Sequence, residues 1–308
     1  MDKNVKIYIA GHRGLAGSAI VRNLQEKGFT NILTRTHAEL DLTDQQATEI
    51  FFAREKPDYV FLAAAKVGGI MANNLYPAEF IRDNLVIQTN VIHAAYKNDV
   101  QRLMFLGSSC IYPKLAPQPM KEEYLLTGPL EPTNRPYALA KIAGIEMCLS
   151  YNRQYGTQFV SVMPTNLYGP NDNYDLNDSH VLPALLRKTH EAKVHGDNKL
   201  VVWGSGMPMR EFLHVNDMAD ACVFLMEQGI SDGVYNVGTG ADVTIHGLAR
   251  IITEVVGFQG KIEFDTSKPD GTPRKLLDVS RMSALGWKAR ITLRDGIQQT
   301  YQTYLGSL

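Results

Sequence analysis

The chain has 308 residues, enough for one large domain or two modest ones with a core that needs no disulfide or metal. Its 31 basic and 32 acidic residues nearly balance, which gives no support for a nucleic-acid-binding surface, and its 44% hydrophobic content is not typical of a disordered protein. No apolar run approaches the roughly 18–20 residues that span a bilayer.

The first half of the chain alternates short apolar runs with amphipathic stretches. The pattern predicts strands at 5–10, 31–34, 59–64, 103–106 and 159–163. It predicts a first helix with apolar positions from 15 to 24 that closes at Gly28, and further helices at 44–55, 78–97 and 136–155. Strands that alternate with helices are typical of a parallel sheet covered on both faces, and near-continuous apolar strands fit such burial. The predicted class is therefore α/β with a doubly wound parallel sheet.

The pattern changes after residue 164. Asn and Asp crowd the stretch 166–178, which is predicted as a loop. A helix around 216–228 and a strand at 234–237 still fit the first sheet. We therefore expect two interleaved domains. The larger one, which holds the parallel sheet, comprises 1–164 and about 214–238. The smaller, substrate-capping one comprises about 165–213 and 239–308.

Cysteine use and the N-terminus bear on the compartment. Cys110, Cys148 and Cys222 form no CxxC motif and cannot all pair. The N-terminal residues lead directly into a strand-like segment, so no secretory signal is expected. These features predict reduced thiols in the cytoplasm. Cys148 and Cys222 lie in helical patterns, where a cysteine is usually a small buried hydrophobe.

A glycine-rich turn, Gly11-His12-Arg13-Gly14-Leu15-Ala16-Gly17, separates the first predicted strand from the first helix. Glycine lets the backbone turn tightly and approach a pyrophosphate, whose charge then faces the helix N-terminus. The spacing is GxxGxxG rather than GxGxxG. The context of the turn favours a dinucleotide site, and the alternative is a glycine-rich turn without a ligand.

The end of the second strand bears on cofactor choice. An acid normally stands there to accept the ribose hydroxyls of NAD, but the sequence is Thr34-Arg35-Thr36-His37. Arg13 and Arg35 can instead bind a 2′-phosphate, which favours NADPH; the alternative is that both are solvated. Asp41 can contact the adenine edge or cap the next helix.

Tyr137 and Lys141 stand at i and i+4 on one face of the helix predicted to begin near Pro136. A lysine cation nearby lowers the tyrosine pKa from its usual value of about 10, so the phenol can exchange a proton with a substrate oxygen. The YxxxK pattern alone is common by chance. It is supported by Ser108, which ends a predicted strand, because ligands of open α/β sheets lie beyond the carboxyl ends of strands.

The glycine turn, Ser108 and the segment 137–141 together resemble the extended branch of the short-chain dehydrogenase/reductase family, whose members act on nucleotide sugars. Within that branch the chain resembles the bifunctional epimerase–reductases that convert GDP-4-keto-6-deoxy-D-mannose to GDP-L-fucose. The closer match runs over nearly the whole chain, in the segments 63–70, 107–113, 164–170, 201–206, 209–215 and 268–275. The resemblance implies a Rossmann sheet, epimerisation at C3 and C5, and NADPH-dependent reduction at C4.

The resemblance implies the catalytic residues Ser108, Cys110, Tyr137, Lys141 and His180. Cys110 and His180 would be the acid–base pair for the two inversions, and their usual pKa values of about 8.5 and about 6.5 bracket neutral pH. Ser108 and Tyr137 would hold the C4 oxygen as the enolate forms and again as hydride arrives. Position alone would not select His180, because a lone histidine is more often structural or exposed.

The resemblance also implies the residues that contact the cofactor. They are Gly11, His12, Arg13, Gly14, Leu15, Ala16, Gly17, Arg35, Asp41, Leu42, Leu106, Gly107, Lys141, Pro164, Thr165, Asn166, Leu167 and His180. His37 departs from the family pattern, in which a second arginine often stands, and this weakens the preference for NADPH without removing it.

For the nucleotide sugar, the resemblance implies contacts from Asn166, Lys188, Trp203, Arg210 and Asp270. The family pattern has arginine at position 188; Lys188 keeps the charge without the bidentate geometry, and Arg187 can compensate. Trp203 is either a flat wall for a sugar or base, or a core residue. No cluster of His, Cys and carboxylates has metal-ligand spacing.

The long helices at 78–97 and 136–155 carry apolar residues beyond one stripe. Examples are Phe80, Leu85, Val86 and Val91 in the first and Ile142, Ile145, Met147 and Leu149 in the second. In the family such helices form a four-helix dimer interface, so a homodimer is expected; the alternative is two ordinary core helices.

Two other functions fit parts of the sequence. One is another nucleotide-sugar enzyme of the same branch, a 4-epimerase or a dehydratase; the dehydratase is disfavoured, because dehydratases typically have acidic residues where Ser109 and Cys110 stand. A non-enzymatic NADPH-binding regulator usually lacks the Tyr/Lys pair, which is present here.

Overall fold

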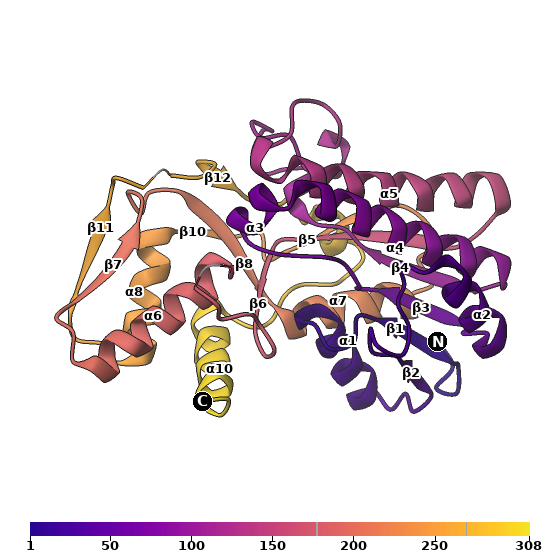
Figure 1. The fold of residues 1–308 in the computed structure, drawn as a ribbon, viewed down its shortest axis with the longest axis horizontal. Helices are drawn as coiled ribbons and strands as arrows, with labels where there is room; N and C mark the ends of the chain where they lie inside the picture. The colour runs from indigo at the N-terminus through magenta and orange to yellow at the C-terminus, as the bar shows by residue number, and fades with distance from the viewer. Residues whose placement is uncertain (177, 269) are drawn as a thin grey trace.

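The computed structural model describes residues 1–176, 178–268 and 270–308. Asn177, in the predicted loop, and Pro269, in the segment 268–275, lie outside these ranges. A six-stranded, all-parallel sheet in the order β2-β1-β3-β4-β5-β9 forms the larger part of the molecule (Figure 1). Its strands are β1 (Ile7–Ala10), β2 (Ile32–Thr34), β3 (Tyr59–Leu62), β4 (Arg102–Leu106), β5 (Phe159–Pro164) and β9 (Val234–Val237).

Helices cover both faces of this sheet, because its strands are apolar on both sides. Ile7 and Ile9 of β1 belong to one buried core, while Tyr8 and Ala10 belong to another. The first core lies under α1 (Leu15–Glu26) and α7 (Val215–Glu227). The second lies under α2 (Gln45–Glu55), α4 (Pro77–Lys97) and α5 (Arg135–Tyr155). The predicted α/β class with a doubly wound parallel sheet is confirmed.

A smaller region is built around a mixed sheet with the order β10-β8-β12, in which β6 also pairs with β8, and a separate pair, β7 and β11. Its strands are β6 (Asn166–Tyr168), β7 (Lys199–Trp203), β8 (Met209–His214), β10 (Asp242–Thr244), β11 (Lys261–Asp265) and β12 (Arg274–Lys275). The helices α6 (Val181–His195), α8 (Ile245–Val256) and α10 (Leu293–Leu305) enclose a third core beside these strands. Figure 1 shows this region at the end of the molecule opposite β2.

Two short elements differ from the sequence prediction. Residues Asn166–Tyr168, predicted as the start of a loop, form strand β6, which pairs in parallel with Phe212–His214 of β8. A further helix, α3 (Ile70–Leu75), was not predicted. The partner of β6 is far away in the sequence, so the local Asn-rich and Gly-rich pattern could not indicate the pairing. Because β5 runs almost directly into β6, the carboxyl end of the large sheet meets the small sheet there.

None of the helices in the described ranges is long and apolar enough to cross a membrane.

Candidate active site

The glycine turn packs tightly against the neighbouring strand. Gly11 has φ +87°, and a Cβ there would lie 2.7 Å from the main-chain nitrogen of Ala64. A Cβ on Gly17 would lie 2.2 Å from the carbonyl oxygen of Gly11. Both positions therefore require glycine, the first for its conformation and its space, the second for space alone.

The N-terminus of α1 is open to an anion. Gly14 caps it without a side-chain hydrogen bond, and the first turn carries no acidic residue. The first N–H groups of the helix therefore keep donors for a ligand, and the helix dipole favours negative charge at this end. A dinucleotide diphosphate fits this arrangement.

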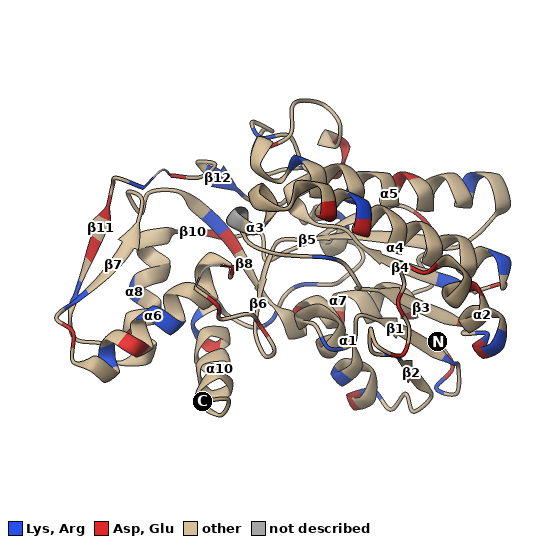
Figure 2. Cartoon of the chain, viewed as in Figure 1, with Lys and Arg blue, Asp and Glu red and all other residues tan. Residues whose placement is uncertain are grey.

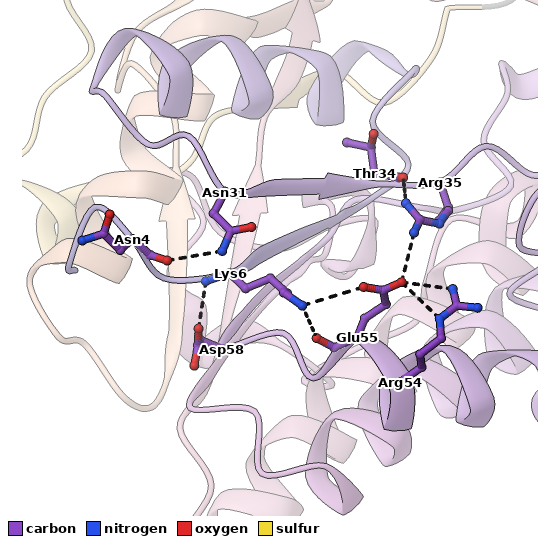
Figure 3. Close-up of polar contacts among 8 residues, drawn as sticks. All are labelled: Asn4, Lys6, Asn31, Thr34, Arg35, Arg54, Glu55 and Asp58. Carbon is purple, nitrogen blue, oxygen red and sulfur yellow. Dashed lines mark hydrogen bonds and ion pairs between the residues drawn. The ribbon is translucent and has the colours of Figure 1, made fainter.

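Arg35 follows β2, and its guanidinium is held by its neighbours (Figure 3). Its Nη1 donates to the carbonyl oxygen of Thr34 at 2.7 Å, and its Nη2 lies 3.1 Å from Oε1 of Glu55. Glu55 also accepts from Arg54 and lies near Lys6, so three cations share one carboxylate. Arg35 thus retains unsatisfied donor capacity.

Asp41 does not cap the next helix, so that alternative is wrong. The cap of α2 is Asp44, which accepts from Ala47 N at 2.9 Å. Asp41 instead accepts from the main-chain and side-chain groups of Thr43, at 2.8 Å and 2.7 Å.

Several predicted cofactor contacts meet at one edge of the sheet, since the ends of β4 and β5 are adjacent. Leu106 ends β4, and Gly107, the residue after it, donates from its main-chain nitrogen to Val162 O of β5 at 2.8 Å. Pro164 ends β5, and Thr165 joins it to β6, which contains Asn166 and Leu167. Leu42 lies in the core beneath α2. The Asn166 amide already donates to Glu211 O at 2.7 Å.

The loop that holds the predicted catalytic residues Ser108 and Cys110, here called the catalytic loop, begins where β4 ends. Ser108 is extended, with φ −164°, and its Oγ accepts from Cys110 N at 3.3 Å, which starts the short 3₁₀ turn Ser109–Ile111. This bond fixes the hydroxyl and the thiol two residues apart on one turn. Both side chains are only partly covered.

The helix α5 brings the phenol and the ammonium to the same edge. Lys141 is 3% exposed, and its Nζ donates to the carbonyl oxygen of Leu106 at 2.7 Å. The Nζ lies 5.9 Å from the centre of the Tyr137 ring. Phe80 of α4 packs edge-on against Tyr137, with ring centres 6.3 Å apart. Ser108, Cys110, Tyr137 and Lys141 are therefore brought to the carboxyl end of β4.

Burial, rather than Lys141, dominates the titration of Tyr137. Burial raises the pKa of the phenol above its usual value, and the thiol of Cys110 raises it further. The expected lowering of the Tyr137 pKa by Lys141 is therefore wrong, because the burial of the phenol dominates. Burial also lowers the pKa of Lys141, to about 8. Tyr137 is a protonated phenol at neutral pH, which is the form that can donate a proton.

Cys110 and His180 also lie against protein while remaining reachable by solvent. Burial raises the pKa of the Cys110 thiol, which Lys275, the Ser108 hydroxyl and Lys141 lower. Burial lowers the pKa of His180, although the residue remains accessible to solvent. His180 precedes α6, and the main chain before it is held by Gly69 N, which donates to Asp178 O at 2.9 Å.

The burial of Lys141 predicts a pH-dependent stability. Its folded-state pKa of about 8 lies below the 10.5 of free lysine, so between these values the unfolded chain holds a proton that the folded chain has lost. The free energy of unfolding of the wild type, relative to that of Lys141→Met, should therefore rise with pH across this window, by up to about 3 kcal/mol. Urea unfolding at several pH values measures this; a difference that stays constant up to pH 10.5 would contradict it.

The predicted substrate residues all lie in the smaller region, on β6 (Asn166), α6 (Lys188), β7 (Trp203), β8 (Arg210) and the segment between β11 and β12 (Asp270). Trp203 is 56% exposed, so the alternative of a core residue is wrong. Lys188 and Lys268 place their Nζ atoms 4.7 Å and 5.5 Å from the centre of its indole. Arg210 lies on β8 near Asp270. Asp270 accepts from the main chain and hydroxyl of Ser205, and Arg187, next to Lys188, is held by Glu191 and the Tyr174 carbonyl.

Two residues near these groups had no predicted role. Glu211 is fully buried on β8 and accepts from the main-chain nitrogens of Thr239 and Gly240, both at 2.7 Å, and of Leu277 at 2.9 Å. Lys275 of β12 lies opposite Arg210 of β8 in the strand register, and Figure 2 shows a blue stretch on each of these two strands of the small sheet. The segment 268–275 carries the resemblance, but its sequence pattern does not show which charges face the catalytic loop. Nowhere in the described ranges do three or more His, Cys, Asp or Glu residues form a group that could hold a metal ion.

Comparisons with known proteins identify the family. The model described as NAD dependent epimerase/dehydratase family matches residues 7–238. GDP-L-fucose synthase 1 of Arabidopsis thaliana is 62% identical over 304 residues, covering 99% of this chain and 94% of that protein. GDP-L-fucose synthase of Escherichia coli strain K12 is 58% identical, with coverage of 97% and 96%. MlghC, a GDP-mannoheptose C4 reductase from Campylobacter jejuni solved with NADP bound, has a TM-score of 0.90 and 42% identity, with 99% of each chain covered.

These matches extend over nearly the whole chain and agree with the motifs. The resemblance inferred from the glycine turn, Ser108 and the Tyr137–Lys141 pair is confirmed. The chain belongs to the NAD-dependent epimerase/dehydratase family, in the group that contains the GDP-L-fucose synthases.

Proposed function

We propose that this protein converts GDP-4-keto-6-deoxy-D-mannose to GDP-L-fucose, by epimerisation at C3 and C5 followed by NADPH-dependent reduction at C4. The observation that carries the proposal is the meeting of Ser108, Cys110, Tyr137 and Lys141 at the carboxyl end of β4. The two relatives named GDP-L-fucose synthase are 58% and 62% identical to this chain over nearly their full length, whereas the GDP-mannoheptose C4 reductase is 42% identical.

The chemistry of the substrate explains why these groups stand together. The C4 ketone acidifies the protons on C3 and C5, so negative charge collects on the C4 oxygen whenever one of them leaves. Hydroxyl donors from Ser108 and Tyr137 stabilise that enolate oxygen. The same donors serve the C4 oxygen during reduction, when Tyr137, protonated at neutral pH, gives it a proton.

Cys110 and His180 act as the acid–base pair of the epimerisation. Inversion needs one group to remove a proton from one face of the sugar ring and another to return a proton to the opposite face. The two residues come from different segments, the turn after β4 and the loop before α6, which suits a pair on opposite faces. Burial moves their pKa values in opposite directions, up for the thiol and down for the imidazole.

NADPH supplies the hydride for C4. The N–H groups at the start of α1 bind its diphosphate, and Arg13 and Arg35 bind its 2′-phosphate. Residues 106–107 and 164–167, with Lys141 and His180, would make further contacts to the bound cofactor. On the substrate side, Lys188, Trp203, Arg210, Asn166 and Asp270 bind the GDP-sugar.

Arg35→Ala should raise the KM for NADPH about 10–100-fold, because one charge-assisted hydrogen bond contributes about 1.5–3 kcal/mol. The KM for NADH should change little, since NADH has no 2′-phosphate. Arg54→Ala is the matched control: Arg54 binds the same Glu55 carboxylate, yet its side chain is 65% exposed. Equal effects of Arg35→Ala on both cofactors would contradict the role of Arg35.

The proposal is tested by incubating the purified protein with NADPH and GDP-4-keto-6-deoxy-D-mannose in deuterium oxide. The absorbance of NADPH should fall, and the sugar product should be GDP-L-fucose with deuterium at C3 and C5. Oxidation of NADPH without incorporation of deuterium would identify a simple C4 reductase instead.

We infer a homodimer formed by the outer faces of α4 and α5. Of the apolar residues considered for the interface, Phe80, Val91, Ile142 and Ile145 are buried within one chain, so for them the alternative of core helices is correct. Leu85, Val86, Met147 and Leu149 remain partly exposed, and Leu139 and Tyr155 of α5 are exposed. Light scattering at micromolar concentration should give the mass of a dimer, and a monomer would contradict this interface.

We also infer that the enzyme works in the cytoplasm. All three cysteines are free thiols, and the proposed chemistry requires Cys110 to stay reduced.

A further inference from the structure

Glu55 is the last residue of α2, at the end of the helix where the helix dipole favours cations and disfavours an acid. Its carboxylate faces three cations (Figure 3). Oε1 lies 3.1 Å from Arg35 Nη2 and 3.0 Å from Arg54 Nη2, and Oε2 lies 3.7 Å from Lys6 Nζ. The place of this charge is therefore explained by its partners and not by the helix that carries it.

Two hydrogen bonds and an aromatic ring hold the guanidinium of Arg35. Its Nη1 donates to Thr34 O at 2.7 Å, and its Nη2 donates to Glu55 Oε1 at 3.1 Å. Its Cζ lies 5.6 Å from the centre of the Phe51 ring, within reach of a cation–π contact. Thr34 is the neighbour of Arg35 in the chain, so Glu55 is the hydrogen-bond acceptor that fixes the guanidinium from another element.

Glu55 is itself held in place from β1. The ammonium group of Lys6, just before that strand, donates to the main-chain oxygen of Glu55 at 2.7 Å and also faces its carboxylate. The side chain of Arg54 is 65% exposed, whereas that of Glu55 is 19% exposed. The nearest acid in the sequence after Arg35 is Glu39, whose carboxylate accepts from Thr36 N and Oγ1 at 2.7 Å and 2.8 Å. Among the described residues, Glu55 is thus the carboxylate bonded to Arg35.

We propose that Glu55 is a positioning residue that holds Arg35 in the orientation that binds the 2′-phosphate of NADPH, and that it contributes in this way to the choice of NADPH over NADH. A guanidinium has five N–H donors, so donors remain for phosphate oxygens after the bonds to Thr34 and Glu55. Binding phosphate through two parallel hydrogen bonds requires a correctly oriented planar fork, and an arginine that rotates freely must first be immobilised. The inference deepens the proposed function and rests on it for the role of Arg35.

The test is the binding of NADPH and NADH in the absence of sugar substrate, followed by the fluorescence of the reduced nicotinamide. In Glu55→Ala the Kd for NADPH should rise about 3–10-fold, because the side chain of Arg35 must be ordered on binding. The Kd for NADH should change little. Glu55→Gln keeps an oxygen that accepts from Nη2 and should bind NADPH nearly as the wild type does. The matched control is Glu49→Ala, which removes a carboxylate of the same helix that accepts from Gln45 at 2.9 Å.

A second comparison separates positioning from a general effect on the fold. In an Arg35→Ala background, Glu55→Ala should leave the Kd for NADPH unchanged, because Glu55 acts through Arg35. Equal weakening of NADPH and NADH, or the same loss in both backgrounds, would overturn the proposal in favour of a structural role. A loss in Glu55→Gln as large as in Glu55→Ala would show that an acceptor for Nη2 is not what matters.

Tighter binding of NADPH by Glu55→Ala would also overturn the proposal, because it would show that the carboxylate only repels the phosphate. If the expected Kd values are found but the deuterium experiment fails, the selection of the cofactor stands and the proposed sugar substrate falls. If Arg35→Ala weakens NADPH alone while Glu55→Ala has no effect, the role of Glu55 falls and the proposed function stands.

Discussion

Replacing Tyr137 by Phe is expected to lower the rate of NADPH oxidation about 10²–10⁴-fold, the usual contribution of a positioned general acid. The variant loses one hydroxyl from a ring that Phe80 packs in place, so the fold should be retained. It removes both the proton that the C4 oxygen receives and a donor to the enolate, so deuterium exchange at C3 and C5 should slow as well.

Tyr155→Phe is the matched control, because Tyr155 ends the same helix and is exposed. Its turnover should equal that of the wild type. Stopped-flow absorbance measures the reduction, and thermal unfolding checks that both variants are folded. A Tyr137→Phe enzyme with near wild-type turnover would show that another group protonates the C4 oxygen.

Replacing Cys110 by Ser should separate the two activities of the enzyme. A serine hydroxyl is far less acidic than a thiol, so incorporation of deuterium at C3 and C5 should fall about 10²–10⁴-fold. Reduction should continue on the unepimerised keto sugar, because Ser108, Tyr137 and Lys141 are untouched. The product should then be a GDP-sugar with the starting configuration at C3 and C5.

Cys148→Ala is the control for loss of a thiol, since Cys148 is buried in the core under α5. The Cys148→Ala variant should be less stable, but its ratio of deuterium incorporation at C3 and C5 to reduction at C4 should equal that of the wild type. Nuclear magnetic resonance of the product gives the deuterium content at each carbon. Exchange at the wild-type rate in Cys110→Ser would remove Cys110 from the acid–base pair.

The periodicity of the sequence was sufficient to predict the strands of the large sheet, but it predicted the small sheet less well. Strands such as Tyr59–Leu62 are fully buried and apolar on both faces, so the pattern identifies them without knowledge of their neighbours. Strand β6 exists because β8 lies beside it, and residues 166–168 alone do not contain that information. The proposed division into two interleaved domains stays a prediction.

The sequence indicated which residues of the site lie close together. The shifts of their pKa values could be found only from the structure. The family motifs contain Ser108, Tyr137 and Lys141, and the structure brings them to one strand end. The sequence could not show that burial outweighs the effect of Lys141 on the phenol, because burial depends on residues such as Phe80 from another helix. The position of Lys275 follows from the pairing of β12 with β8, which is equally non-local.

In the proposed function one pocket serves three steps, the epimerisations at C3 and C5 and the reduction at C4. The most direct test is a crystal structure with NADP⁺ and the GDP-keto-sugar bound. We expect the C4 oxygen within hydrogen-bond distance of Ser108 Oγ and Tyr137 Oη, with Cys110 and His180 on opposite faces of the sugar ring. A C4 oxygen far from the phenol, or a thiol remote from C3 and C5, would contradict it.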